Sequence, residues 1–299
     1  MEARVAPGER AQATVEWIAL VLVVALLLLG LVAGTAARLP ASGLARAITA
    51  RLLCAVRLFD SCAQDAELIV AYGPALAALM HEHAPAIVYE DEMTALPVDF
   101  RSCRGQRCGN GPDSGAVWAS DSGEPAAAFV HAVDCRTAAS RAAAVRHGYE
   151  CTGGRTGNLY LQYWLYYEDS TSLRRVPGAI GHHEDDWEGY QVRIGADGTE
   201  SRATSHHGYN YSGGVGSWLS DAGLVHRSAW GTSTGRLYVS GGSHAGRVVV
   251  DSDPGRWTPA DHLALIPIET LDDGARRTSF AVDPPWRKPV YRDPEDQGT

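Results

Sequence analysis

The longest apolar run of the chain lies near its N-terminus. Residues 17–37, WIALVLVVALLLLGLVAGTAA, carry no charge, and about 20 such residues span the hydrocarbon core of a bilayer as a helix. A cleaved secretory signal has an apolar stretch of only about 7–15 residues. The pattern therefore predicts a transmembrane helix over 17–37 behind a short cytoplasmic N-terminus, residues 1–16.

Apolar residues then recur at helical spacing as far as residue 83. Leu44, Ile48 and Leu52 are an example, and this period is typical of amphipathic helices. We predict two helices over 38–83, hinged near Cys62. They form either a stalk or the first cover of a domain core.

Beyond residue 83 the pattern changes to short β-rich runs between clusters of Gly, Pro, Asp and Ser. The run LYLQYWLYY, residues 159–167, places aromatic residues on both alternating sets of positions. Such alternation indicates a strand buried on both faces. Further strands are expected at 86–89, 187–194, 236–240 and 247–251.

These patterns predict a mainly β fold, namely a β-sandwich ectodomain over 84–283 with flanking helices, behind one N-terminal transmembrane helix. The Ala-rich stretch 126–147 is expected to include a short helix. No helix of normal length is expected after the mid-180s. Residues 284–299 are rich in proline and charge, which predicts a disordered tail.

Charge and cysteine content narrow the class of protein. The net charge is −9 and Lys288 is the only lysine, and an acidic domain without a basic stripe argues against nucleic acid as a partner. Six cysteines follow the apolar run without a CxxC pair, which is typical of disulfides in an oxidising compartment, with buried free thiols as the alternative. Proximity favours Cys54–Cys62, Cys103–Cys108 and Cys135–Cys151. We expect a single-pass protein of the cell membrane whose C-terminal domain is extracytoplasmic.

The stretch GHHEDDWEGYQV, which begins at residue 181, crowds histidines and carboxylates together. On a strand, Asp186 and Glu188 share one face while Trp187 points to the other, and neighbouring carboxylates repel unless a cation lies between them. Glu184 and Asp185 are expected to be solvated turn residues. Two later histidines beside glycines complete a candidate divalent-cation site for Ca²⁺, Mg²⁺ or Zn²⁺, whose ligands would be His183, Asp186, Glu188, His207 and His244. The alternative for the two carboxylates is structural pairing with an arginine.

An aromatic loop follows the second histidine. Tyr209 and Tyr211 precede a Gly-Gly pair, so they are candidate contacts for a carbohydrate or lipid, or a cover for the core. A metal-bound water could also be activated for hydrolysis with Glu188 or Asp186 as base. No GxSxG or HExxH signature accompanies the site.

The residues before the apolar run resemble the processing site of bacterial Flp-type pilins and TadE-like pseudopilins. The resemblance implies cleavage between Ala11 and Gln12, with Glu16 fifth in the mature chain and Trp17 after it. The family usually has glycine where Ala11 stands. The alternative is a plain anchor with an accidental match.

Several later stretches resemble, in order, the vacuolar protein sorting-associated protein 62 family: APAIVY from residue 84, LQYW from 161, HEDDWE from 183, HHG from 206 and GSHA from 242. The Asp186-Trp187-Glu188 core is also similar to the heptapeptide of the necrosis-inducing proteins. Those are cytolytic β-sandwich proteins that hold a divalent cation and bind membrane sphingolipids, and here Glu184 and Asp185 replace their basic residues. The resemblance implies a β-sandwich.

Three functions stay open from the sequence. The first is a binding module in which a cation organises a site for a glycan or lipid headgroup. The second is a metal-dependent hydrolase that uses the same residues. The third is a minor pilin-like component of a pilus-assembly or secretion system.

Overall fold

The computed structural model describes residues 62–296, except 91–92, 94, 105–114, 172–181, 207–208, 212–229, 232–233 and 249–254. The chain divides into two compact units, residues 1–73 and 74–299. None of the helices in the described ranges is both long and apolar enough to cross a membrane. The predicted membrane helix over 17–37 and the pilin-like residues Ala11, Gln12 and Glu16 lie outside those ranges.

Helix α3, Cys62–Tyr72, ends at Gly73. Gly73 has φ +79°, the left-handed conformation that glycine adopts most readily after a helix, and its N–H donates to the Ile69 carbonyl (2.8 Å). Helix α4, Pro74–Glu82, starts at the next residue, where the fixed φ of proline suits a first helical position. The break between the described helices is thus at Gly73, whereas the sequence predicts a hinge near Cys62.

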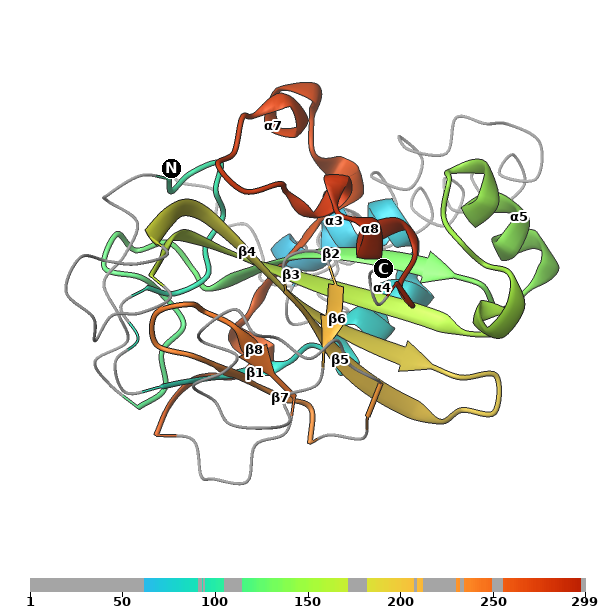
Figure 1. Cartoon of the computed structure of the whole chain (residues 1–299), viewed down its shortest axis with the longest axis horizontal. Coiled ribbons are helices and arrows are strands. Elements are labelled where there is room, and N and C mark those ends of the chain that lie inside the picture. The colour runs from blue at the N-terminus through green and yellow to red at the C-terminus, as the bar shows by residue number, and fades with distance from the viewer. Residues whose placement is uncertain are drawn as a thin grey trace, which may run out of the picture. The chain divides into compact units, whose positions relative to one another are not determined.

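The larger unit contains a six-stranded sheet in the order β10-β2-β3-β4-β5-β6 (Figure 1). Strand β10 is parallel to β2, and the other neighbours are antiparallel. The strands are β2 Ala127–Asp134, β3 Leu159–Thr171, β4 His182–Ile194, β5 Glu200–His206, β6 Tyr209–Tyr211 and β10 Ala264–Pro267.

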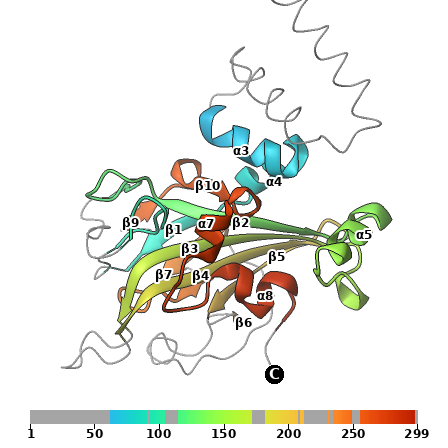
Figure 2. The same ribbon diagram turned by 90° about the horizontal axis from the view of Figure 1, so that it is seen from above.

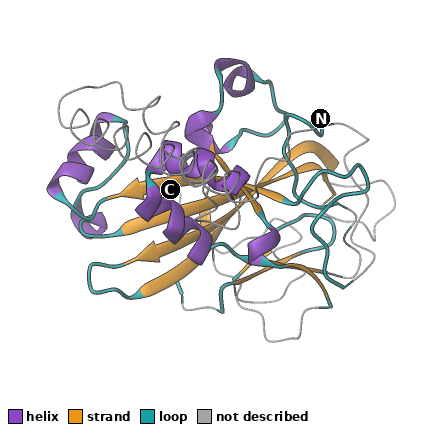
Figure 3. Ribbon diagram, turned by 180° about the vertical axis from the view of Figure 1, so that it is seen from behind, coloured by secondary structure: helices purple, strands orange, loops and turns teal. Residues whose placement is uncertain are grey.

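A second, four-stranded sheet has the order β8-β7-β1-β9. Strands β1 and β7 are parallel, and β9 and β8 run antiparallel to their neighbours. The strands are β1 Ala86–Tyr89, β7 Arg236–Val239, β8 Gly246–Arg247 and β9 Arg256–Thr258. The described fold is therefore mainly β, with two mixed sheets and a few helices (Figure 3), which agrees with the predicted class.

Strand β3 is the core of the molecule, because residues 159–167 are all buried, as their two-sided aromatic pattern predicts. One face carries Tyr163, whose hydroxyl donates to the Met80 carbonyl of α4 (2.7 Å). The other face carries Gln162, whose amide donates to the Val290 carbonyl of α8, Pro289–Arg292 (2.7 Å). Helices α4 and α8 accordingly lie on opposite sides of the sheet (Figure 2).

C-terminal elements cover the α8 side of the sheet. They are η3 Ile268–Thr270, α7 Asp273–Arg277, η4 Pro285–Arg287 and α8, and they follow η2 Ala260–His262 and strand β10. The predicted disordered tail is therefore wrong for residues 285–292. Val290 and Tyr291 are buried there against the aromatic cluster that contains Trp164 and Trp187, so the tail has apolar surface that is stabilised by burial.

The Ala-rich stretch 126–147 forms a strand and then a helix. Strand β2 occupies its first half, which the sequence pattern missed, and α5, Ala138–Arg146, is the expected short helix. Thr137 caps α5, since its hydroxyl accepts from the Ser140 N–H (3.1 Å) and Ser140 reciprocates. This reciprocal capping box satisfies N–H groups that the first turn leaves unpaired.

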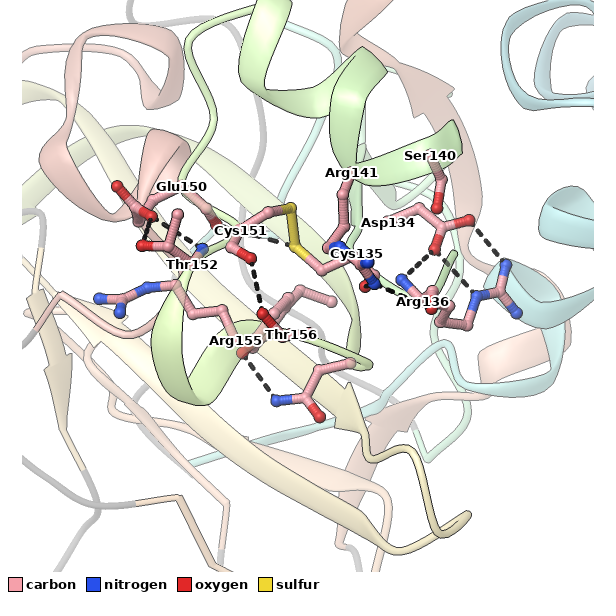
Figure 4. The surroundings of a disulfide bond; sticks show 12 residues. Asp134, Cys135, Arg136, Ser140, Arg141, Glu150, Cys151, Thr152, Arg155 and Thr156 are labelled. Atoms are coloured by element: carbon pink, nitrogen blue, oxygen red, sulfur yellow. Dashed lines mark hydrogen bonds and ion pairs between the residues drawn. A yellow bond between two sulfur atoms is a disulfide. The ribbon is translucent and has the colours of Figure 1, made fainter. Parts of the chain in front are cut away.

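A disulfide joins Cys135, at the end of β2, to Cys151, just before η1, Gly153–Arg155 (Figure 4). Both cysteines are buried, and their Cα atoms are 5.3 Å apart. This pair is the one that proximity predicts. Cys103 is also disulfide-bonded, while its predicted partner Cys108, and Cys54 of the third pair, lie outside the described residues.

Candidate functional site

Asp186 and Glu188 lie together on the face of β4 opposite the aromatic cluster. They pair across β3 with Tyr167 and Leu165, and each is only 2% exposed. Trp187, between them, points to the other face and packs against Phe129 and Tyr166. The predicted division of this strand into two faces is thus confirmed.

His244 reaches Asp186 from the second sheet. It lies in the turn between β7 and β8, and its Nδ1 is 3.0 Å from Asp186 Oδ2. Its imidazole stacks on the Tyr167 ring, with centroids 4.0 Å apart and an interplanar angle of 13°. All three side chains are buried. The two sheets therefore meet at an acid–histidine pair. Of the five predicted ligands, Asp186 and His244 are in contact, and Glu188 lies on the same face of β4 as Asp186.

Backbone strain is concentrated at the same place. Two non-glycine residues of the described ranges have positive φ, Asp185 (59°) and His244 (54°). One precedes Asp186 in the chain and the other contacts its carboxylate. Such conformations cost about 1–3 kcal/mol each and are retained where the surrounding structure holds them, most often at functional sites.

Asp185 is an anchor rather than the solvated turn residue that the sequence suggests. Its carboxylate accepts two bonds from Arg104 (2.8 and 2.7 Å), one from the Tyr166 hydroxyl (2.8 Å) and one from the Ala281 N–H (2.9 Å). Burial by itself would raise the pKa of Asp185, but these bonds favour the ionised form and lower the pKa overall. These bonds fix the position of Asp185, and so they help to position Asp186, the next residue in the chain.

The negative charges of Asp186 and Glu188 are not fully offset by nearby positive charge. Burial raises the pKa of Glu188 well above its usual value, and the neighbouring charge of Asp186 raises it further. Electrostatic interactions with Lys288 and His244 oppose this shift in the pKa of Glu188 but do not cancel it. The site therefore favours a bound proton or another cation.

Lys288, the only lysine of the chain, is buried behind β4. Its Nζ donates to the carbonyl of Trp187 (2.8 Å), the residue between the two acids, and lies 5.5 Å from the centre of the Trp164 ring. Burial lowers the pKa of Lys288, while Glu188 and Asp186 work in the opposite direction. Apart from the rarity of lysine, no pattern in the sequence indicates this placement.

A buried hydroxyl beside the acid pair has no hydrogen-bond partner within the part of the chain that the structure describes. The Tyr167 side chain is fully buried, and its hydroxyl is unpaired among the described atoms. Burial, followed by the charges of Tyr89, Glu188 and Asp186, raises the pKa of Tyr167. An unpaired buried hydroxyl costs about 1–3 kcal/mol, so this one marks a place for a polar group.

The other predicted site residues are not brought into this cluster. His183 is half-buried, and its Nδ1 lies 3.2 Å from the Glu184 carbonyl oxygen. His207 lies outside the described residues, as do the side chains of Tyr209 and Tyr211, whose backbone forms β6. Within the described residues, no three His, Cys, Asp or Glu side chains are grouped to hold a metal ion.

A surface pocket of about 420 Å³ lies elsewhere, between the loop at Phe100–Arg104 and α7. Its lining includes Arg101 and Asp272 and none of the predicted site residues. Arg101 is already paired with Asp99 (2.7 Å) and Arg104 with Asp185. The charges that line the pocket are thus largely balanced within the protein.

No protein-family model matches the chain, and no curated protein matches it. Three solved structures of NLPPya, a necrosis and ethylene-inducing-like protein, are similar: a triple mutant and complexes with mannosamine and with glucosamine. Identities are 15%, 14% and 14% and TM-scores 0.39, 0.38 and 0.38, over 73% of this chain and 87% of NLPPya. These are proteins of the kind that the heptapeptide comparison named, but a TM-score below 0.5 assigns neither family nor activity. The sorting-associated and pilin-like resemblances stay predictions.

Proposed function

We propose that the chain is a membrane-anchored binding module in which Asp186, Glu188 and His244 hold a divalent cation, and that this cation organises a site for a glycan or lipid headgroup. The observation that carries the proposal is the 3.0 Å contact between Asp186 Oδ2 and His244 Nδ1 across two sheets. Both atoms belong to buried side chains, and one of them is held at a strained backbone position.

Asp186 and His244 supply two donor types that cations bind, although they form a hydrogen bond with each other and are not part of a three-ligand group within the described residues. A carboxylate oxygen and an imidazole nitrogen about 3 Å apart have the spacing of two adjacent ligands at roughly 2.0–2.3 Å from one ion. Glu188 adds a second carboxylate, whose pKa is raised by burial and then by the neighbouring charge of Asp186. The unpaired hydroxyl of Tyr167 is available to a water on that ion.

The remaining ligands and the choice of metal follow from the sequence prediction. His183 and His207 are the further candidates, and a set rich in histidine favours Zn²⁺ whereas carboxylates and water favour Ca²⁺ or Mg²⁺. When bound, the ion supplies Lewis-acid attraction for hydroxyl or phosphate oxygens. Tyr209 and Tyr211, in the sheet that carries Asp186, are the proposed aromatic contacts to such a ligand.

The two other functions have less support. A hydrolase using Glu188 or Asp186 as base needs substrate within hydrogen-bond reach, and both carboxylates are 2% exposed. A pilin-like role rests on Ala11, Gln12 and Glu16 alone. Membrane anchoring rests on the apolar run over 17–37, and carbonate extraction of cell membranes tests it directly.

The metal proposal is tested on the full-length chain purified in detergent. Wild-type protein is stripped with chelator, and the binding of Ca²⁺, Mg²⁺ and Zn²⁺ is then measured by calorimetry. We expect one cation per chain in the wild type. Asp186→Asn and His244→Gln should each weaken its affinity at least about tenfold, because each removes one ligand.

Glu184→Gln is the matched control, because Glu184 is an exposed carboxylate on the same strand. It should bind the cation like the wild type. Absence of stoichiometric binding in the folded wild type, or equal affinity in all four proteins, contradicts the proposal.

A further inference from the structure

The C-terminal strap, residues 284–296, carries a positive charge to the back of the acid pair. Its only lysine, Lys288, is buried and donates to the Trp187 carbonyl (2.8 Å). That carbonyl belongs to the peptide group that joins Trp187 to Glu188. The ammonium group therefore lies directly behind the strand segment whose front face carries Asp186 and Glu188.

The strap is held by several independent contacts. Arg155 binds the Asp293 carboxylate through two bonds of 2.6 Å. Glu295 accepts from Tyr160 (2.8 Å) and from Arg193 (2.9 Å). These bonds come from three separate places on the sheet and the loop before it, so the position of Lys288 does not depend on its own hydrogen bond alone.

A single ammonium cannot balance this site fully. The charges of Glu188, Asp186 and Asp283 raise the pKa of Lys288. In return, Lys288 and His244 lower the pKa of Glu188. Burial of an ammonium group is unfavourable, because the group loses its hydration, unless nearby negative charge offsets that loss. Retention of a buried lysine here is therefore physically linked to the two carboxylates on the other face of β4.

We infer that the strap regulates the cation site: Lys288 acts as an internal counter-cation for Asp186 and Glu188, so that docking of the strap weakens binding of a divalent cation and the cation in turn loosens the strap. This inference rests on the proposed function. Like charges on the two faces of one strand repel through a medium of low dielectric constant. Reciprocity between the two events is required by thermodynamic linkage.

The first test compares Lys288→Met with Lys288→Arg in the full-length chain. Met keeps a long apolar stem and removes the charge, whereas Arg keeps the charge. Binding of Ca²⁺, Mg²⁺ and Zn²⁺ is measured by calorimetry, and circular dichroism confirms folding. Lys288→Met should bind the cation about tenfold more tightly than the wild type, while Lys288→Arg should stay near the wild-type affinity.

The second test needs no substitution, because the chain has a single lysine. Wild-type protein is acetylated with an amine reagent with and without each cation, and peptide mapping separates Lys288 from the terminal amine. The cation should accelerate acetylation of Lys288, since it loosens the strap. A slower or unchanged rate in the presence of a bound cation overturns the inference, even if Lys288→Met fails to fold.

The outcomes separate the two proposals. If the wild type binds a cation and folded Lys288→Met binds it equally or less tightly, the regulatory role is wrong and the cation site stands. If neither folded protein binds any of the three cations, the cation site itself is wrong, and the regulatory role with it.

Discussion

The burial of Glu188 beside Asp186 sets how the stability of the domain depends on pH at the residue scale. The pKa of Glu188 is raised in the folded chain, so the folded state holds its proton more tightly than the unfolded state does. The contribution of this proton to stability is complete below the ordinary glutamate pKa and is lost as pH rises through the raised pKa.

Glu188→Gln is therefore expected to stabilise the metal-free domain at high pH. Glutamine resembles the protonated acid in shape and carries no charge, so the variant should gain on the order of 1–3 kcal/mol above the raised pKa and little at pH 4. Urea unfolding between pH 4 and 9 with chelator present measures this. An unchanged pH slope in Glu188→Gln, with Glu184→Gln as control, would show that Glu188 does not hold a proton in the folded state.

Asp185 has the opposite pH dependence. Because its pKa is lowered, the stability it contributes is present above the ordinary aspartate pKa and is lost as pH falls through the lowered value. In the variant Asp185→Asn, the asparagine can adopt the positive φ of this position, but it lacks the negative charge that binds Arg104. We expect the free energy of unfolding to fall by about 1–3 kcal/mol at pH 7, toward the lower end because Arg104 is partly exposed to solvent. The loss should be smaller in acid.

The paired control for Asp185→Asn is Asp99→Asn. Asp99 also binds an arginine through both oxygens, but on the surface. A surface pair contributes about 1 kcal/mol or less. Equal losses in the two variants, measured by urea unfolding at pH 7, would mean that burial of Asp185 adds nothing.

At the scale of elements, the disulfide ties the loop that carries α5 to the end of β2. The two cysteines are 16 residues apart in the sequence. For a loop of this length, the loss of loop-closure entropy in the unfolded state predicts a stabilisation of about 3 kcal/mol. The double variant Cys135→Ala/Cys151→Ala should lose roughly that amount without reductant. This variant, rather than added reductant, isolates the bond, since Cys103 is also disulfide-bonded. An unchanged free energy of unfolding would show that the loop is already ordered by its other contacts.

Elements with a strong periodic pattern could be predicted from the sequence. The two-sided aromatic run gave β3, and alternation around Trp187 gave the two faces of β4. Strand β2 was missed because its small apolar residues fit a helix equally well, and only its pairing with β3 decides between them. The strap was missed because Pro-rich, charged composition does not reveal that Val290, Tyr291 and Lys288 are buried.

The candidate site was predictable as a set of residue types but not as an arrangement. Asp186, Glu188 and His244 were found because carboxylates and histidines beside glycines are chemically conspicuous. Lys288, Tyr167 and the anchoring of Asp185 depend on contacts between residues distant in sequence, such as Arg104 with Asp185. No local pattern records such contacts.

At the scale of the whole molecule, each sheet contains a pair of neighbouring strands that come from distant parts of the chain. Strand β1 pairs with β7 and β9, and β2 pairs with β10. A ribosome or a translocation pore releases the N-terminal end first, so β1 waits for partners made some 150 residues later, and β2 for one near residue 265. Neither sheet can be completed before almost the entire chain has emerged. Until then, β2 has one edge without its partner strand and the aromatic face of β3 lacks its C-terminal cover. The interval between the emergence of β2 and of β10 is therefore the period when the nascent protein most needs a chaperone.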